Sequence, residues 1–415
     1  MLIAADFSAF GQLRIDSPYS RFGLGDVNPG YNVYQSSMGG VGYGVKDPLR
    51  ISTINAAALA SIDSGNFVFN AAFNGLLVDT KTSTQSGGSN YFNLAYLKFG
   101  LPVTTWWRTG AGLTPFTTIG YNVSTYNTID SIGEVRFSHL GDGGITNIYW
   151  NNAFRIGKKL SVGVDMSYLF GNINYRRQDQ MTSLPFAFKY RLTNSINVKS
   201  LYFDYGAQYY TLFGKEKNYY DKKYFLGLGL KYAPQQNFKA VKSAFGITYT
   251  DGASGNEFVK DTIINIVQDK GQIVIPQKIG AGISIGKRHA WMFAGDFTYD
   301  QWSKYSSFGV QDSLKNSIHY NVGGQYYIGR YTLNAGFKYN NSFLDINNTA
   351  INSYGITFGV GFPLRNNNMT VSDIDLSFEI GRRGTTNNNL IQQNYFQVRL
   401  GINIRNRWFQ RAKYL

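Results

Sequence analysis

The chain has 415 residues, among them 46 glycines, 31 tyrosines, 30 phenylalanines and no cysteine. Charged residues make up 16%, below the roughly 25% of typical soluble domains, and no stretch approaches the ~18 consecutive apolar residues of a membrane-spanning helix. The absence of cysteine excludes disulfide scaffolds, thiolate metal sites and cysteine nucleophiles.

The net charge of +15 comes from basic residues scattered among turns and strand ends. Without a basic stripe or a recognition motif, this balance argues against nucleic acid as a partner. Attraction to an anionic lipid surface explains the same charge more simply, so we expect outer-membrane lipid and lipopolysaccharide as the surroundings.

The N-terminal 65 residues lack periodic structure. Residues 1–12 resemble the tail of a signal peptide, without its basic first region and full apolar core, and we expect the mature chain to begin near Gln12. Residues 13–65 are rich in glycine and serine. Aperiodic stretches of about 50 residues are usually functional or occluding.

From residue 66 onward the sequence alternates with period two. In residues 318–328, Ile318, Tyr320 and Val322 lie on one face while His319 and Asn321 lie on the other. We expect about fourteen strands, at residues 67–78, 91–101, 107–121, 145–156, 160–173, 198–212, 224–232, 273–285, 290–302, 317–328, 331–339, 353–362, 371–382 and 395–404.

The joins between these strands alternate in length. Short joins fall at residues 102–105, 157–159, 286–288, 329–330 and 363–368, and long ones at 122–144, 171–197 and 233–272. Short periplasmic turns alternating with long extracellular loops are typical of an all-β, antiparallel transmembrane barrel of the bacterial outer membrane, over residues 66–415. A barrel of this size leaves an open lumen unless something fills it, so we interpret residues 13–65 as a plug or hatch inserted from the periplasmic side.

Tryptophans near strand ends fit the aromatic girdles of such a barrel. Trp106, Trp107, Trp291 and Trp408 lie beside the predicted short turns, and Trp302 lies at the opposite end of its strand. We expect all five at the two membrane interfaces.

The inward faces carry polar groups, which we expect to form salt bridges with the plug and with each other, because a charge facing lipid costs roughly 2–4 kcal/mol at the midplane. These groups are Asp165, Asp204, Lys231, Lys278, Asp296, His319, Lys338, Asp373, Asp375, Glu379 and Arg399. Asp373, Asp375 and Glu379 share one face, and we expect them to pair with Arg399 and Arg405 on the adjacent strand.

No catalytic constellation stands out. The three histidines, His139, His289 and His319, fall in a long loop, a short turn and an inward face, so neither a metal cluster nor a Ser-His-Asp triad is indicated. We expect no enzyme activity and no cofactor.

Two runs in the N-terminal segment resemble the hatch of the FadL family of outer-membrane transporters for long-chain fatty acids and other hydrophobic compounds. They are Ser-Met-Gly-Gly-Val-Gly-Tyr-Gly at 37–44 and Ile-Asn-Ala-Ala-Ala-Leu-Ala at 54–60. The matching positions are Met38, Gly39, Gly40, Gly42, Asn55, Ala56 and Ala57. The family's Asn-Pro-Ala motif lacks its proline here.

A proline interrupts the third predicted strand. Pro115 follows Gly112 and precedes Phe116, and proline cannot donate to a strand ladder, so it indicates a bulge, kink or edge. The resemblance to FadL implies a lateral opening at such a kink, lined by Gly112, Pro115 and Phe116. A local bulge without a passage is the equal alternative.

Segments 17–26 and 407–414 resemble those of Bacteroidota outer-membrane proteins, among which FadL-like barrels include subunits of secretion and assembly machines. Two functions therefore remain: a channel for passive uptake of small hydrophobic, fatty-acid-like compounds through a lateral opening, or a structural or client-binding subunit of an outer-membrane assembly or secretion complex. A channel should present an apolar groove among its outer loops. A scaffold should show a filled polar lumen and an apolar or aromatic patch outside.

Overall fold

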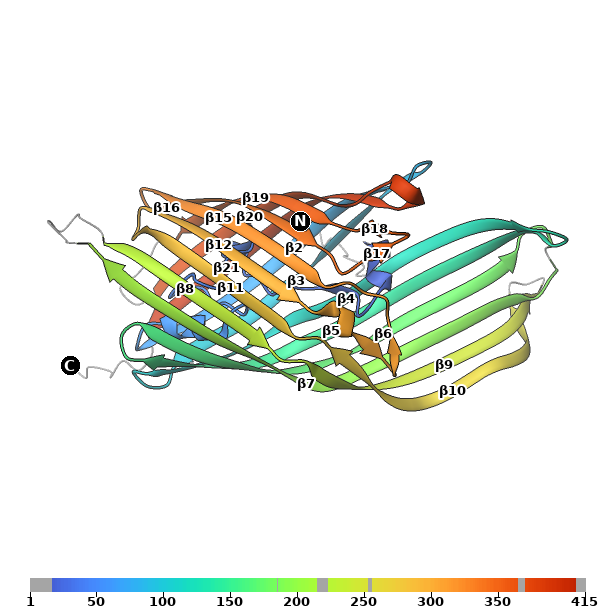
Figure 1. Ribbon diagram of the computed structural model, residues 1–415, viewed down its shortest axis with the longest axis horizontal. Coiled ribbons are helices and arrows are strands. Elements are labelled where there is room, and N and C mark those ends of the chain that lie inside the picture. Colours follow the sequence, from blue (N-terminus) through green and yellow to red (C-terminus); the bar gives the residue numbers. More distant parts are fainter. Residues whose placement is uncertain (1–16, 185, 215–222, 253–255, 365–369, 408–415) are drawn as a thin grey trace, which may run out of the picture.

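The computed structural model describes residues 17–184, 186–214, 223–252, 256–364 and 370–407. These residues form a closed antiparallel β-barrel (Figure 1), and the closure is made by β2, which pairs with both β3 and β21. The predicted fourteen-stranded wall is confirmed. Its strands are β2 (Asn66–Lys81), β3 (Ser86–Pro102), β4 (Trp107–Ile129), β5 (Gly133–Ile156), β6 (Leu160–Met181), β7 (Lys189–Phe213), β8 (Tyr224–Ala233), β11 (Lys278–Lys287), β12 (Trp291–Asp300), β15 (Ser317–Ile328), β16 (Tyr331–Asn341), β19 (Ser353–Pro363), β20 (Thr370–Gly384) and β21 (Gln392–Arg407).

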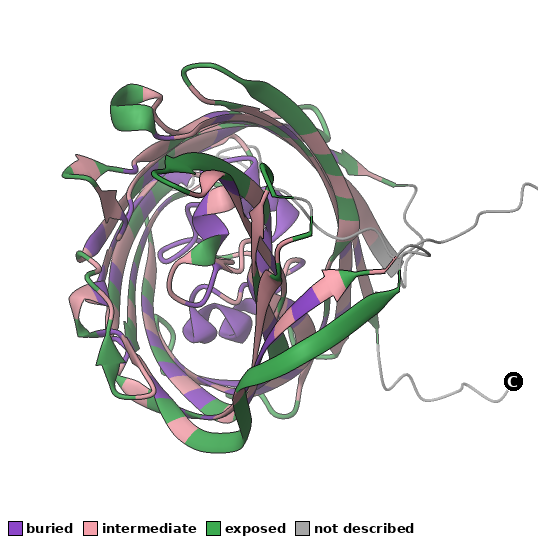
Figure 2. Ribbon diagram, turned by 90° about the vertical axis from the view of Figure 1, so that its right-hand side faces the viewer, coloured by how far each residue is buried: buried purple, intermediate pink, exposed green. Residues whose placement is uncertain are grey.

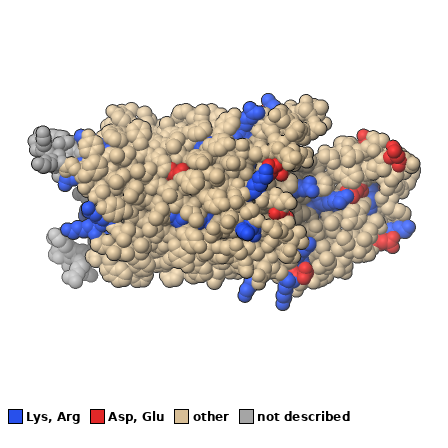
Figure 3. Space-filling view, viewed as in Figure 1, with Lys and Arg blue, Asp and Glu red and all other residues tan. Residues whose placement is uncertain are grey.

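The alternation places apolar side chains outside and polar ones inside. On β15, Val322 and Tyr326 are 53% and 59% exposed, whereas Asn321 and Gln325 are buried. On the face drawn in Figure 3, charged side chains gather at the short-turn end and over the long-loop half, and the wall between carries few. This apolar belt is that of a bacterial outer-membrane barrel. Within the described residues, no helix has the length and apolarity needed to span a membrane.

The long joins are largely strand, contrary to the prediction. Segments 122–144 and 171–197 belong to β4, β5, β6 and β7 except for short turns, and 233–272 holds the hairpin of β9 (Gln236–Asp251) and β10 (Glu257–Ile275). These strands extend to the right in Figure 1. Outside the membrane both faces of a strand meet water, so the apolar alternation that marks a strand in the sequence is lost there.

The hairpin also corrects one strand boundary. Residues 273–275 end β10, and β11 begins only at Lys278, beyond Pro276. β9 continues the wall where β8 has ended, because the first half of β7 pairs with β9 and its second half with β8.

The tryptophans expected in the aromatic girdles differ in their surroundings. Trp106 and Trp107 stack with Phe154 beside the first short turn. Trp302 is instead buried, with its ring centroid 4.5 Å from that of Phe343, so its expected place at the interface was wrong. The indole is buried because Trp302 belongs to the short helix η3 (Trp302–Lys304), which follows β12. Trp408 lies outside the described residues.

Residues 17–65, which we call the hatch segment, lie inside the barrel. Figure 2, a view from the long-loop end, shows their buried elements enclosed by the ring of strands. The elements are η1 (Pro18–Arg21), β1 (Asp26–Val27), α1 (Val33–Ser36) and η2 (Ala56–Ser61). α1 begins at a capping box in which Asn32 and Gln35 bond each other's backbone N–H groups. The expected signal-peptide remnant, residues 1–12, lies outside the described residues.

Glycines on the inner wall allow the hatch segment to lie directly on the strand backbones. A Cβ at Gly229 would collide with the carbonyl of Tyr43, and one at Gly206 with the Asn55 side chain. The same close approach occurs at Gly163, Gly227, Gly280, Gly323, Gly336 and Gly359. Part of the glycine excess in the composition therefore reflects these close contacts, since any larger side chain would hold the hatch segment away from the wall.

Small elements complete the long-loop end. They are β13 (Ser306–Ser307), β14 (Val310–Gln311), β17 (Asp345–Ile346), β18 (Thr349–Ala350) and η4 (Asn387–Asn389).

Candidate functional site

The first hatch motif bonds to the barrel wall through its backbone. The N–H of Gly39 donates to Thr357 Oγ1 at 2.8 Å, and those of Gly42 and Tyr43 donate to one oxygen of Asp296 at 2.7 and 3.0 Å. Met38 is fully buried against the wall, and Gly40, with φ of +88°, has the Tyr31 ring where a Cβ would be. Asp296 thus holds the turn that the motif makes.

The second motif forms the N-terminal cap of η2. The Asn55 side chain accepts from Ala57 N–H at 3.1 Å and donates to the carbonyls of Tyr43 and Ala207 at 2.8 and 3.2 Å. Ala56 is the first residue of the helix, the position at which proline is well tolerated. The missing proline therefore leaves this turn intact.

The acidic residues of β20 pair with the hatch segment and with β16, which corrects the prediction of partners on β21. Arg50 contacts Asp375 at 2.6 Å and Asp373 at 3.3 Å, and Lys338 contacts Glu379 at 2.6 Å. The hatch segment brings Arg50 to these carboxylates, a contact that no strand pairing could indicate.

The two arginines of β21 that were expected as their partners bond elsewhere. Arg399 donates to Ser36 and Arg405 contacts Asp63 at 3.1 Å, both in the hatch segment. The other inward polar groups interact within the wall: Lys231 with Asp204 at 3.0 Å, Lys278 and His319 with Asp300 at 3.4 and 3.2 Å, and Asp165 with Ser167 at 3.2 Å. Of the other histidines, His139 lies on β5 and His289 in the turn after β11. The described residues hold no group of three or more His, Cys, Asp or Glu arranged for a metal.

The wall is discontinuous between β3 and β4. Their pairing runs only from Pro102 opposite Arg108 to Leu97 opposite Leu113. Beyond this point β4 pairs with the hatch strand β1 instead, Val27 lying opposite Thr117. β3 meanwhile continues, paired to β2, as far as Ser86. The two neighbours therefore separate towards the long-loop end.

Pro115 lies immediately beyond this separation. The β4–β5 register shifts between Pro115 and Thr117, which makes a bulge at Phe116. Gly112 lies before the separation, where its missing side chain leaves room for Tyr149. The three residues proposed from the sequence are thus together at the edge of the gap.

Phe116 points into the barrel and packs against Tyr202 and Phe238, with ring centroids 5.7 and 6.3 Å apart. A cavity of about 90 Å³ adjoins Phe116 and Pro115, and charged side chains, among them Asp165 and Asp204, line it as well. At the long-loop end a separate cleft of about 610 Å³ is lined by Leu24, Ile173, Tyr305 and other mainly apolar side chains.

The sequence model of the BamG family matches residues 1–415. The chain belongs to the BamG family. No curated protein sequence matches it.

The BamG-family chain has the fold of solved FadL-type transporters. A FadL homologue from Pseudomonas aeruginosa is 11% identical, with a TM-score of 0.59 over 93% of this chain and 100% of that one. The toluene transporter TbuX of Ralstonia pickettii is 16% identical, with a TM-score of 0.56 over 92% and 99%. The toluene transporter TodX of P. putida is 14% identical, with a TM-score of 0.57 over 92% and 100%.

Several residues of this BamG-family site were missed by sequence reasoning. Arg50 links three carboxylates, those of Asp47, Asp373 and Asp375. Lys98, buried on β3, reaches Thr53 of the hatch segment at 3.1 Å. For Lys98 the available signal was a charged residue within an otherwise neutral stretch, which marks a group that needs a partner but does not identify it.

Proposed function

We propose that this chain is a structural or client-binding subunit of an outer-membrane protein assembly complex. The observation that carries the proposal is that the hatch segment fills the lumen. The match to the BamG family along the whole chain supports it as well.

The hatch segment fills the barrel in a fixed position. It lies against glycines on strands around the barrel and bonds to Asp296, Thr357 and Asp375. Between the hatch segment and the wall, a cavity of about 320 Å³ is lined by Lys278, Asp300, Lys338, Glu379 and further polar groups. Charged groups that are already paired offer little to an apolar solute, because removing them from water and from each other is costly.

The outer wall provides an apolar surface for a partner. A hollow of about 1060 Å³ crosses β11, β12, β15, β16 and β19. Its floor contains Gly295, Gly324 and Ala335, and its rim includes Phe293 and Phe358, which are 64% and 51% exposed. A shaped, aromatic-rimmed hollow is the kind of surface that an interface in lipid uses, because packing rather than apolarity distinguishes a partner from lipid.

Gentle detergent extraction followed by size determination and mass spectrometry tests this proposal. The wild-type chain should migrate as a large complex with co-purifying protein subunits. Ala335→Trp, which fills the hollow, should weaken the complex. Ala111→Trp is the control: it adds the same bulk on β4, a distant strand of the wall, and should leave the complex intact. Recovery of the wild-type protein as a lone barrel would contradict the proposal.

A second candidate is a passive channel for small hydrophobic compounds, fatty-acid-like in the version suggested by the FadL resemblance. The gap between β3 and β4, beside the Phe116 bulge, favours it, since a compound could leave there into the membrane. Solved structures of similar fold are named as toluene transporters. Phe116 would have to move, because the cavity beside it holds only about 90 Å³.

Uptake of radiolabelled toluene and oleate into cells tests the channel. Phe116→Ala should raise uptake severalfold if Phe116 closes the route, whereas Phe92→Ala, on the outer face of β3, should not. Equal uptake with and without the protein would eliminate the channel.

A further inference from the structure

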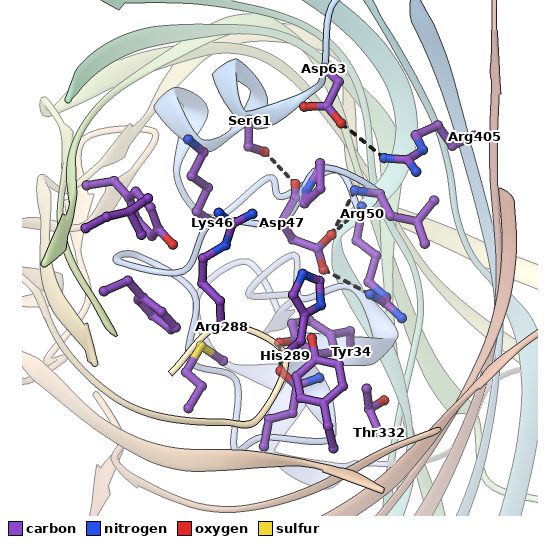
Figure 4. A pocket seen from close by; sticks show the side chains of 18 of the residues that line it. Tyr34, Lys46, Asp47, Arg50, Ser61, Asp63, Arg288, His289, Thr332 and Arg405 are labelled. Atoms are coloured by element: carbon purple, nitrogen blue, oxygen red, sulfur yellow. Dashed lines mark hydrogen bonds and ion pairs between the residues drawn. The ribbon is translucent and has the colours of Figure 1, made fainter. Parts of the chain in front are cut away.

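A second large cavity opens at the short-turn end of the barrel, and we call it the vestibule. It measures about 990 Å³. The hatch segment supplies Lys46, Asp47 and Arg50 to it, and turns of the wall surround it (Figure 4). Nothing proposed above uses this space.

The vestibule is basic. Eight of its lining residues are cationic and three are acidic. The cations are Lys46, Arg50, Arg155, Lys158, Lys287, Arg288, Arg330 and Arg405, and the acids are Asp47, Asp63 and Asp373.

All three acids already have cationic partners. Arg50 contacts Asp47 at 3.0 Å and Asp373 at 3.3 Å, and Arg405 contacts Asp63 at 3.1 Å. The pairs of Arg50 with Asp47 and of Arg405 with Asp63 appear as dashed lines in Figure 4. Lys46, Lys158 and Arg288 therefore have no carboxylate of the lining left to neutralise them.

Lys46, Lys158 and Arg288 are exposed to this space. Within the described part of the chain, none of the three forms an ion pair, and Lys46 only lies over the Tyr210 ring, 4.8 Å from its centroid. Although Lys46 is exposed to the cavity, the surrounding walls partly desolvate its ammonium group, and this desolvation, with the nearby charges of Arg155 and Arg288, lowers the pKa of Lys46 from its ordinary value. An anion bound here would relieve this repulsion.

The cavity suits a peptide better than a small ion. Tyr210 and Phe225 stand in the wall among the cations with their ring centroids 5.6 Å apart, and aromatic side chains are common anchors for protein segments. A space of about 990 Å³ exceeds by far what one phosphate needs. Since the hatch segment closes the floor, an occupant would end here and not pass through.

We infer that the vestibule binds an acidic peptide segment of a partner protein. Its carboxylates would contact Lys46, Lys158 and Arg288, and its aromatic or apolar side chains would lie against Tyr210 and Phe225. The inference rests on the proposed assembly function, which supplies such a partner. It adds the site on this chain and the chemistry of the contact.

Peptide binding to the full-length barrel in neutral detergent tests the inference. The probe is a fluorescein-labelled decapeptide of alternating Glu and Tyr, and its Gln–Tyr counterpart is the reference. The Glu peptide should bind at least ~10-fold more tightly, and its affinity should fall as ionic strength rises from about 0.05 to about 0.3 M. Equal affinity for the two peptides would overturn the inference.

Paired variants locate the binding. Lys46→Gln with Arg288→Gln should weaken Glu-peptide binding about 10-fold, by loss of two charge contacts. Lys260→Gln with Lys270→Gln removes the same charge from exposed positions on β10 and should leave binding unchanged. Heat-modifiable migration on gels verifies that each barrel is folded. Unchanged binding by the first pair would overturn the inference.

Micelles of short-chain phosphatidylglycerol distinguish a lipid site from a peptide site. If the micelles displace the Glu peptide from the vestibule and bind in its place more tightly, the site is for lipid headgroups and the inference fails. None of these measurements needs the native complex, so a negative peptide result would not contradict the assembly proposal. Likewise, failure to recover the complex on extraction would not contradict a positive peptide result.

Discussion

At the scale of single residues, the contact between hatch segment and wall depends on glycines of the inner wall, which have no side chain. Gly229, Gly206 and similar positions admit the hatch backbone because they carry no Cβ. A methyl group at Gly229 meets the Tyr43 carbonyl and one at Gly336 meets the backbone nitrogen of Gly39, and neither can rotate away as a flexible side chain could. The polar contacts of Asp296 and Asn55 then fix the position that the glycines allow.

Gly229→Ala should therefore destabilise the protein by about 1–3 kcal/mol, as overpacking of a well-packed interior does. Its Cβ would overlap the Tyr43 carbonyl. Gly87→Ala is the matched control, because a Cβ at Gly87 has nothing within 4 Å. Urea unfolding in lipid vesicles measures both, and equal midpoints for the two variants would show that the hatch yields easily.

At the scale of elements, the short helix η2 explains how the hatch motif persists without its proline. Asn55 has φ of −138° and ψ of 111°, the extended conformation that a following proline requires. Ala56 is the first helical residue, where proline is favoured.

Ala56→Pro should accordingly be neutral or should stabilise the protein by about 0.4–1 kcal/mol, through lower entropy of the unfolded chain. Ala58→Pro is the contrasting variant. Ala58 N–H donates to the Asn55 carbonyl at 3.1 Å, and loss of that bond with the ring clash should cost about 3 kcal/mol. Thermal unfolding followed by heat-modifiable gel migration separates the two. A larger loss for Ala56→Pro than for Ala58→Pro would refute the cap assignment.

The elements also show how far sequence reasoning reaches. Alternation predicted the membrane part of the wall, because there the two faces of each strand meet lipid and polar interior. It failed at residues 122–144 and 171–197, where strands continue into water, and at Trp302, which folds inward with η3. Inward charges such as Asp375 were identified, but their partner Arg50 lies 325 positions away. Contacts of that kind follow from the path of the hatch segment, which local patterns do not describe.

At the scale of the whole molecule, wall and hatch form one structure. Contacts from hatch to wall reach both early strands and late ones, from Lys98 on β3 to Arg405 on β21. The wall in turn closes where β2 meets β21. The barrel and its contents therefore depend on each other for stability.

Removal of residues 17–62 should consequently leave a barrel with uncompensated lumen charges, among them Asp375 without Arg50. We expect loss of the heat-resistant folded band on gels. Addition of a synthetic peptide of residues 17–62 during refolding should restore part of that band, since the contacts need no covalent link. A truncated barrel as heat-resistant as the full chain would contradict this expectation.

The close contacts of the hatch segment with inner-wall glycines, the glycine seats, also bear on the order in which the barrel folds. Backbone lies against backbone around the inner circumference, so a wall that had already sealed would leave the hatch segment no way to reach those seats from the side. We therefore expect the final seam to form after the N-terminal residues are in place. The first part of this chain to be synthesised would then be the template around which the last strand arrives, and a mistimed closure would yield an empty, misfolded ring.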